Sequence, residues 1–342
     1  MAVITRCDDS VSGAVVIPAT LDGVPVGRIN AEAFEKCRKI TSVTLPDTVT
    51  EIGAYAFAYC YALKHIDFGS SLKTIGNYAF VSNALTSITL PESVTTVGYY
   101  AFDACTSVRT VTIGTKVSQF PWSALFASNS LETITVRPGN KTYHSANGCL
   151  IETATKKLIK AGSKGSIPDD GSVTSIHNQA FRSVETIRIP SSVTLVEGLN
   201  FDTVKTLYID DWKSWCQIEF EQSYGNPLGY AETIYVGNVK FDGKVTIPSG
   251  VTEIKSHAFA ESNVTEVSLP ASVTTIGDQA FYECHKLTTI SLPKNLGRVG
   301  QGAFLGSMLK TVAYAGSESD RRKITIDDSN NELQNATWTY AQ

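Results

Sequence analysis

A phenylalanine recurs along this chain at a nearly constant spacing, and this period limits the possible folds more than any other feature of the sequence. The first spacings are 23, 23, 22 and 24 residues, and the last two are 22 and 23. The recurring residues are Phe34, Phe57, Phe80, Phe102, Phe126, Phe181, Phe201, Phe259, Phe281 and Phe304. A period of ~20–29 residues is typical of proteins built from stacked structural repeats.

The clearest copy of the repeat runs from Leu85 to Cys105, with the sequence LTSITLPESVTTVGYYAFDAC. Ile88 and Leu90 alternate with Thr89, so a strand places the two apolar side chains on one face and Thr89 on the other. Pro91 ends the strand because proline has no N–H to donate to a neighbouring strand. One copy has a single apolar side and no partner within itself, so the copies must stack on one another.

Short triplets with apolar first and last residues recur in phase with the phenylalanines. They are Val43–Leu45, Ile66–Phe68, Ile88–Leu90, Val111–Ile113, Ile134–Val136, Ile187–Ile189, Leu207–Ile209, Ile234–Val236, Val267–Leu269, Ile290–Leu292 and Val312–Tyr314. Together with the period, this pattern is typical of leucine-rich repeats. The sequence predicts a leucine-rich-repeat solenoid, a right-handed, β-rich α/β superhelix with repeats of 22–24 residues and one long parallel sheet.

The repeat also resembles a particular family. Val43–Cys60, Leu85–Cys105 and Val267–Cys284 follow the pattern L-x-x-I-x-I-P-x-S-V-T-x-I-G-x-x-A-F-x-x-C of the BspA-like leucine-rich repeat proteins almost throughout. The resemblance extends over nearly the whole chain. It implies a protein that is secreted or displayed at a microbial cell surface and that adheres to components of a host or of neighbouring cells.

Composition excludes several other classes of function. The net charge of −4 argues against electrostatic binding of nucleic acid or of an anionic membrane. No stretch is long and apolar enough for membrane insertion. The first residues, MAVITRCDDS, lack the apolar core of a signal peptide. We therefore expect a trimmed or mature form of an exported protein, rather than a cytosolic one.

The continuous repeat predicts a single solenoid over residues 1–342, with two inserts and a cap at each end. Residues 1–30 are expected to form an N-terminal partial repeat and cap, because terminal repeats must cover the exposed end of the core. The remaining segments are 31–136 (regular repeats), 137–168 (hairpin insert), 169–209 (repeats), 210–238 (insert with a short helix), 239–304 (repeats) and 305–342 (C-terminal cap).

The two inserts have their own patterns. Cys149–Glu152 and Leu158–Lys160 are short runs with apolar cores, and we expect them to form a β-hairpin that projects from the solenoid. In the second insert, Asp211 can cap a short helix that carries Trp212 and Trp215 on one side. These tryptophans either pack on the solenoid or offer a platform for sugar rings. Farther on, Asp242-Gly243 predicts a tight turn between strands 239–241 and 245–247.

No arrangement of residues predicts catalysis, a metal site or a cofactor. The five histidines fall at different phases of the repeat, so stacking does not gather them. Cys37, Cys60, Cys105 and Cys284 share one repeat position, which we interpret as a small, buried, unoxidised residue of each rung. Cys7, Cys149 and Cys216 lie outside this position, and no C-x-x-C pair exists.

The sequence therefore favours a non-enzymatic binding module with a protein or glycan partner. Thr and Ser dominate the middle positions of the triplets, which face outward, but Arg188, Tyr208 and Tyr235 break this run on successive triplets. Tyr and Arg are enriched at the energetic centres of interfaces, so these three residues are our primary candidate binding site, with Trp212 and Trp215 as secondary candidates. The alternatives are a tyrosine pair that only steadies the sheet and, for the protein, a spacer that holds another domain away from the cell surface.

Overall fold

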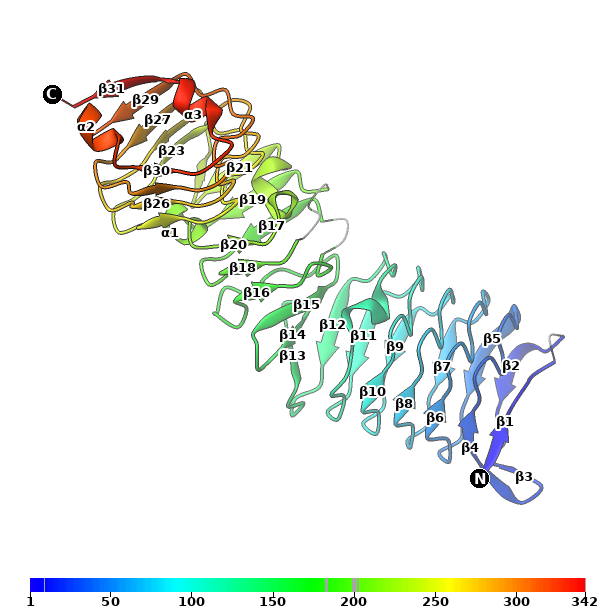
Figure 1. Cartoon of the computed structure of the whole chain (residues 1–342). Helices are drawn as coiled ribbons and strands as arrows, with labels where there is room; N and C mark the ends of the chain where they lie inside the picture. Colours follow the sequence, from blue (N-terminus) through cyan, green and yellow to red (C-terminus); the bar gives the residue numbers. More distant parts are fainter. Residues whose placement is uncertain (9, 182–183, 199–200, 202, 342) are drawn as a thin grey trace. The chain divides into compact units, whose positions relative to one another are not determined.

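The computed structural model describes residues 1–8, 10–181, 184–198, 201 and 203–341 (Figure 1). The contacts of the chain group into two compact units. Unit 1 consists of Met1–Ser166 and a short segment that starts at Gln179, and unit 2 consists of Ile167–Asn178 and the chain from 183 to Gln342. The expectation of one continuous domain stays a prediction. Each unit by itself is a stack of rungs.

In unit 1, the rungs contribute strands to two rows, which Figure 1 labels. The first row contains β2 (Ser12–Val16), β5 (Lys39–Thr44), β7 (His65–Asp67), β9 (Ser87–Thr89), β11 (Thr110–Ile113) and β12 (Thr133–Val136). The second row contains β1 (Ala2–Ile4), β4 (Val24–Ile29), β6 (Glu51–Ile52), β8 (Thr74–Ile75) and β10 (Thr96–Val97), with β3 (Thr20–Leu21) antiparallel to β4. Within each row, the neighbouring strands that pair do so in parallel, as stacked copies of one repeat must.

Unit 2 repeats this arrangement. Its first row contains β17 (Thr186–Ile189), β19 (Thr206–Ile209), β21 (Thr233–Val236), β23 (Lys244–Thr246), β25 (Glu266–Ser268), β27 (Thr289–Leu292), β29 (Thr311–Tyr314) and β31 (Thr337–Tyr340). Its second row contains β16 (Ser175–Ile176), β18 (Leu195–Val196), β20 (Glu219–Phe220), β24 (Glu253–Ile254), β26 (Thr275–Ile276), β28 (Arg298–Val299) and β30 (Thr325–Ile326). The predicted parallel solenoid is thus confirmed. The second row, for which the sequence analysis predicted no strands, also pairs in parallel.

One long sheet does not form, which corrects that part of the prediction. In unit 2 the row is interrupted after β21, because β22 (Val239–Lys240) pairs antiparallel with β21 and occupies its free edge. In unit 1, β7 and β9 belong to different sheets, and the N–H of Thr86 donates to the carbonyl of Lys64 at 3.3 Å between them. The pairing of β21 with β22 also shows that the hairpin turn lies at Gly237-Asn238 and not at Asp242-Gly243.

The core forms where the repeat predicts it. Ile88 and Leu90 are buried and Thr89 between them is exposed, so the predicted register of the strand is confirmed. The phenylalanine rings of successive rungs stack: Phe57 and Phe80 lie 5.2 Å apart, and Phe80 and Phe102 lie 5.3 Å apart. A column of parallel rings therefore fills one side of the stack.

Phe126 does not belong to this column, although its spacing suggested that it does. Leu125, at the end of the short 3-10 helix η1 (Trp122–Leu125), is fully buried, whereas Phe126 is only half-buried. The N–H of Phe102 donates to the carbonyl of Ala124, the bond that Phe80 makes to Ala101 one rung earlier. Ala124-Leu125 therefore takes the place of Ala-Phe in this rung, and Phe126 is displaced to the surface by one residue.

The cysteine position of the repeat has a second role besides packing. In five rungs its side chain donates a hydrogen bond to the carbonyl of the phenylalanine one rung before. The bonds are Cys60 to Phe34 (3.1 Å), Asn83 to Phe57 (3.0 Å), Cys105 to Phe80 (3.1 Å), Ser128 to Phe102 (2.9 Å) and Cys284 to Phe259 (3.0 Å). A small side chain with a donor fits this position, so cysteine, serine and asparagine alternate there. None of the seven cysteines forms a disulfide, as predicted for those of the repeat.

The first insert is part of the core rather than a projection from it. Residues 143–161 form an antiparallel sheet of β13 (Tyr143–Ala146), β14 (Cys149–Glu152) and β15 (Lys157–Ala161). Cys149, Leu150 and Ile151 are fully buried. The predicted hairpin is confirmed, but three consecutive buried residues on β14 leave no face for solvent, so the predicted projection is wrong.

Short helices complete the inserts and the C-terminal end. Asp211 caps α1 (Trp212–Trp215) by accepting the N–H of Ser214, as predicted. The others are η2 (Ser223–Gly225), η3 (Pro227–Gly229), α2 (Glu318–Arg321) and α3 (Asn331–Asn335). Among the described residues, no helix has the length and apolar character that crossing a membrane requires.

Candidate functional site

The three primary candidates lie side by side on the first row of unit 2. Arg188 on β17 pairs with Tyr208 on β19, and Tyr208 pairs with Tyr235 on β21. Each side chain is the outward member of its triplet, because its neighbours along the strand, such as Leu207 and Ile209, point into the core. Parallel pairing in register therefore brings three residues that are 20 and 27 positions apart in sequence onto one surface.

The two tyrosine rings stack on each other. Their centroids are 4.9 Å apart and their planes differ by 9°. Both side chains are half-buried, and neither hydroxyl makes a hydrogen bond to the part of the chain that the structure describes. Since each ring covers one face of the other, the pair offers outer faces, ring edges and two free phenol groups to a partner.

Cations lie at both ends of this pair. The guanidinium of Arg188, 55% exposed at its side chain, donates to a carboxylate oxygen of Asp210 at 2.6 Å. Asp210 also accepts the N–H of Ser191 at 2.8 Å, so it is held in place from two sides. At the other end, Lys240 on β22 pairs with Tyr235 and is exposed. The stacked tyrosines thus lie between an arginine that an ion pair holds in position and an exposed lysine.

The secondary candidates do not join this surface. Trp215 is buried, its indole N–H donates to the carbonyl of Ala258 at 2.7 Å, and its ring contacts Phe220 at 5.3 Å. Trp212 is half-buried against Phe241 and Phe259, at 5.3 and 5.5 Å. The second insert uses both tryptophans for packing, and Trp215 has no ring face left for a sugar.

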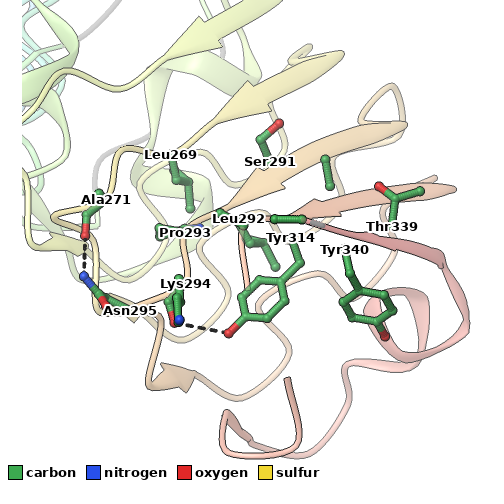
Figure 2. Close-up of a pocket in the computed structure, with 13 residues that line it drawn as sticks. Leu269, Ala271, Ser291, Leu292, Pro293, Lys294, Asn295, Tyr314, Thr339 and Tyr340 are labelled. Atoms are coloured by element: carbon green, nitrogen blue, oxygen red, sulfur yellow. Dashed lines mark hydrogen bonds between the residues drawn. The ribbon is translucent and has the colours of Figure 1, made fainter. Parts of the chain in front are cut away.

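A groove that the sequence analysis did not find lies where the strands of the first row end in unit 2. Its volume is about 470 Å³, and it is lined by residues from the ends of β25, β27, β29 and β31 (Figure 2). Figure 2 shows the ring of Tyr314 beside Lys294, with the ring of Tyr340 on its other side. The hydroxyl of Tyr314 donates to the carbonyl of Lys294 at 3.1 Å, which fixes that ring. Because its lining comes from four rungs that are separated in sequence, no local motif predicts it.

Unit 1 carries a second aromatic surface that the sequence analysis also missed. Tyr55, Tyr78 and Tyr100 each precede a core phenylalanine by two residues, and all three are half-buried at the surface. Their recurrence at one repeat position is the signal that could have identified them.

The described residues can be compared with two common catalytic arrangements, a metal centre and an activated thiol. No group of three or more His, Cys, Asp or Glu residues among them is arranged to hold a metal ion. Burial raises the pKa of Cys60, Cys105, Cys149 and Cys284 to about 12, so these thiols stay protonated and are poor nucleophiles at neutral pH.

The sequence model of the BspA type leucine rich repeat region matches this chain in six copies, over residues 27–147 and 233–337. These ranges cover most of the rungs in both units and leave out the segment with the first row strands β17 and β19. No curated protein matches the chain.

Solved structures of bacterial repeat proteins have the same fold. A leucine-rich repeat protein from Bacteroides ovatus is 21% identical with a TM-score of 0.57, and the alignment covers 97% of this chain and 94% of that one. A leucine-rich repeat protein from Eubacterium ventriosum is 23% identical with a TM-score of 0.54, covering 88% and 90%. The pneumococcal vaccine antigen PcpA is 17% identical with a TM-score of 0.52, covering 99% and 92%.

Proposed function

Because this chain belongs to the BspA-type leucine-rich repeat family, we propose that it is a non-enzymatic binding module that is secreted or displayed at a microbial cell surface. Its partner is a protein or a glycan of a host or of a neighbouring cell. The observation that carries the proposal is the stacked pair of Tyr208 and Tyr235 with Arg188 and Lys240 at its ends. The remaining outward positions of the first row are mostly Thr and Ser.

The physical character of these side chains supports a binding role. Tyrosine offers a large, rigid contact area at a small cost in rotamer entropy, and arginine offers several donors in one plane. The bond from Arg188 to Asp210 uses part of the guanidinium and leaves other N–H groups free for a partner. A tyrosine pair that only stabilised the sheet could have hydroxyls that are hydrogen-bonded within the protein. Here neither hydroxyl makes a hydrogen bond to the described part of the chain.

The direct test is a binding screen of the intact protein against glycan arrays and extracellular proteins, followed by variants. Replacing Tyr208 and Tyr235 together with Ser should lower the affinity for an identified partner at least tenfold. Thr112→Ser with Thr135→Ser, on the equivalent outward row of unit 1, is the matched control and should leave it unchanged. Equal affinities of the tyrosine variant and the unaltered protein would remove this surface from the proposal, and the absence of any partner would favour the spacer role.

A further inference from the structure

Three tyrosines on successive rungs of unit 1 form a stacked column at its surface, which we call the tyrosine ladder. Tyr55 and Tyr78 have ring centroids 4.9 Å apart with planes 9° apart, and Tyr78 and Tyr100 are 5.1 Å and 6° apart. All three lie in unit 1, on the turns beside the second row of strands, and the candidate surface at Arg188 lies in unit 2. The ladder is therefore an independent feature of the chain.

The fold does not require tyrosine at this position of the repeat. The three tyrosines have φ of 56°, 57° and 56°, in the left-handed region that non-glycine residues seldom adopt. The equivalent residues of unit 2 are His257, Gln279 and Gly302, with φ of 60°, 53° and 57°. The same turn thus forms with an imidazole, an amide or no side chain at all, so the backbone does not explain why unit 1 has aromatic rings there.

The two ends of the ladder differ in chemical character. Beyond Tyr100, the rings of Trp122 and Phe126 are tilted by 72° and 75° relative to it, at 6.4 and 6.0 Å, so the stack ends in a corner. At the other end, Glu32 occupies the ladder position of the first rung, with φ of 60°. Glu32 is exposed, and its carboxylate makes no ion pair with the residues that the structure describes. A cationic group of a partner could therefore bind there.

The ladder presents proton donors along its length. Among the described residues, no hydrogen bond is found for the hydroxyls of the three tyrosines. Partial desolvation and the neighbouring phenols raise the pKa of Tyr78, so its hydroxyl keeps its proton at neutral pH. A partner with unpaired acceptors at a matching spacing would satisfy these donors.

The spacing of the rings distinguishes between classes of partner. Three rings 4.9 and 5.1 Å apart extend over about 10 Å. A polyproline II helix rises ~3.1 Å per residue and repeats every third residue, which gives about 9 Å per turn, and its backbone carbonyls are unpaired. A β-strand repeats its side chains on one face about every 6.7 Å, so neither its first nor its second repeat matches the distance of about 10 Å between the outer rings, which one polyproline II turn matches to within about 1 Å. Sugars stack on ring faces, and in the ladder the inner faces cover one another.

We propose that the tyrosine ladder binds a proline-rich peptide segment in the polyproline II conformation, with a lysine or arginine of that segment at Glu32. The tyrosine hydroxyls donate to the carbonyls of the peptide, and its proline rings pack against the ring edges and against the corner formed by Trp122 and Phe126. Recognition of polyproline II helices by aromatic surfaces is an established mode of peptide binding.

The test uses the intact protein and three labelled peptides in a titration followed by fluorescence anisotropy. The first has ten prolines and a terminal arginine, the second replaces the arginine with glutamate, and the third replaces the prolines with alternating Gly and Ser. We expect the first to bind at least tenfold more tightly than the third and several-fold more tightly than the second. Equal binding of the first and third peptides would overturn the proposal.

Variants then assign the binding to the ladder. Replacing Tyr55, Tyr78 and Tyr100 by His, Gln and Gly installs the residues that unit 2 has at these positions, so the turn should still form, and circular dichroism checks this. We expect the triple variant to lose at least tenfold in affinity for the arginine peptide. Glu32→Gln should lose about threefold in affinity for the arginine peptide and should not lose affinity for the glutamate peptide. Tyr78→Phe keeps the stack without one hydroxyl and should lie between the unaltered protein and the triple variant.

Tyr208→Ser in unit 2 is the matched control and should leave peptide binding unchanged, so failure of the ladder and failure of the proposed surface at Arg188 are distinguishable. The proposal would be refuted if the folded triple variant kept its full affinity for the peptide. It would also be refuted if the proline peptide did not bind and the ladder instead bound an oligosaccharide, with that binding lost in the triple variant.

Discussion

Replacing Phe102 by Ala is the sharpest test of how the rungs hold together. The ring of Phe102 is fully buried and stacks on the ring of Phe80, with centroids 5.3 Å apart. On the other side of Phe102, the next rung provides the side chain of Leu125 instead of another aromatic ring. Losing the transfer free energy of a buried phenylalanine costs about 2–3 kcal/mol. A residual cavity of roughly 60–80 Å³ adds about 1.5–2 kcal/mol at ~24 cal/mol per Å³. The free energy of unfolding should therefore fall by about 3.5–5 kcal/mol.

The assay is urea unfolding followed by circular dichroism, together with amide hydrogen exchange. Each rung contacts only its neighbours, so exchange should accelerate most strongly in the rungs next to Phe102. Phe102→Leu is the informative comparison, because leucine occupies this place one rung later, and it should cost roughly 1–1.5 kcal/mol. Thr89→Ala, at an exposed position of the same rung, should cost less than about 0.5 kcal/mol. If Phe102→Ala and Thr89→Ala gave equal losses, the assignment of the core column would be wrong.

Three further predictions concern protonation, thiol chemistry and backbone contact. Hydrogen bonds from Thr115 and Arg137 lower the pKa of Glu92 to about 2. The stability that ionised Glu92 contributes is therefore present above the usual carboxyl pKa and is lost as the pH falls from about 4.5 toward 2. In the Glu92→Gln variant, the melting temperature should depend less on pH over that range. Cys105, whose pKa burial raises to about 12, should react with a thiol reagent at pH 8 only after unfolding. Gly76→Ala should strongly lower the melting temperature, because its Cβ would lie 2.6 Å from the backbone nitrogen of the previous rung, whereas Gly297→Ala, with 3.7 Å of space, should be tolerated.

The sequence alone determined the solenoid and most of its core. Repeats that have one apolar side and no internal partner can only stack, so the period was sufficient to predict parallel rungs, the burial of Ile88 and Leu90 and the exposure of Thr89. Stacking in register also predicted that Arg188, Tyr208 and Tyr235 share one surface, because residues at equal repeat positions become neighbours across strands. A regular repeat thus converts spacing in sequence into distance in space.

The tertiary structure decided every feature that depends on the fit between rungs. A shift of one residue placed Leu125 rather than Phe126 in the core, because the neighbouring rung fixes which side chain faces inward through its backbone hydrogen bonds. The pairing of β22 with β21, and not with β23, depended on which strand edge was free, and it brought Lys240 beside Tyr235. Spacing alone shows that Tyr55, Tyr78 and Tyr100 recur, but only the positive φ of their turns and the 5 Å separation of the rungs turn them into a stacked ladder at the surface.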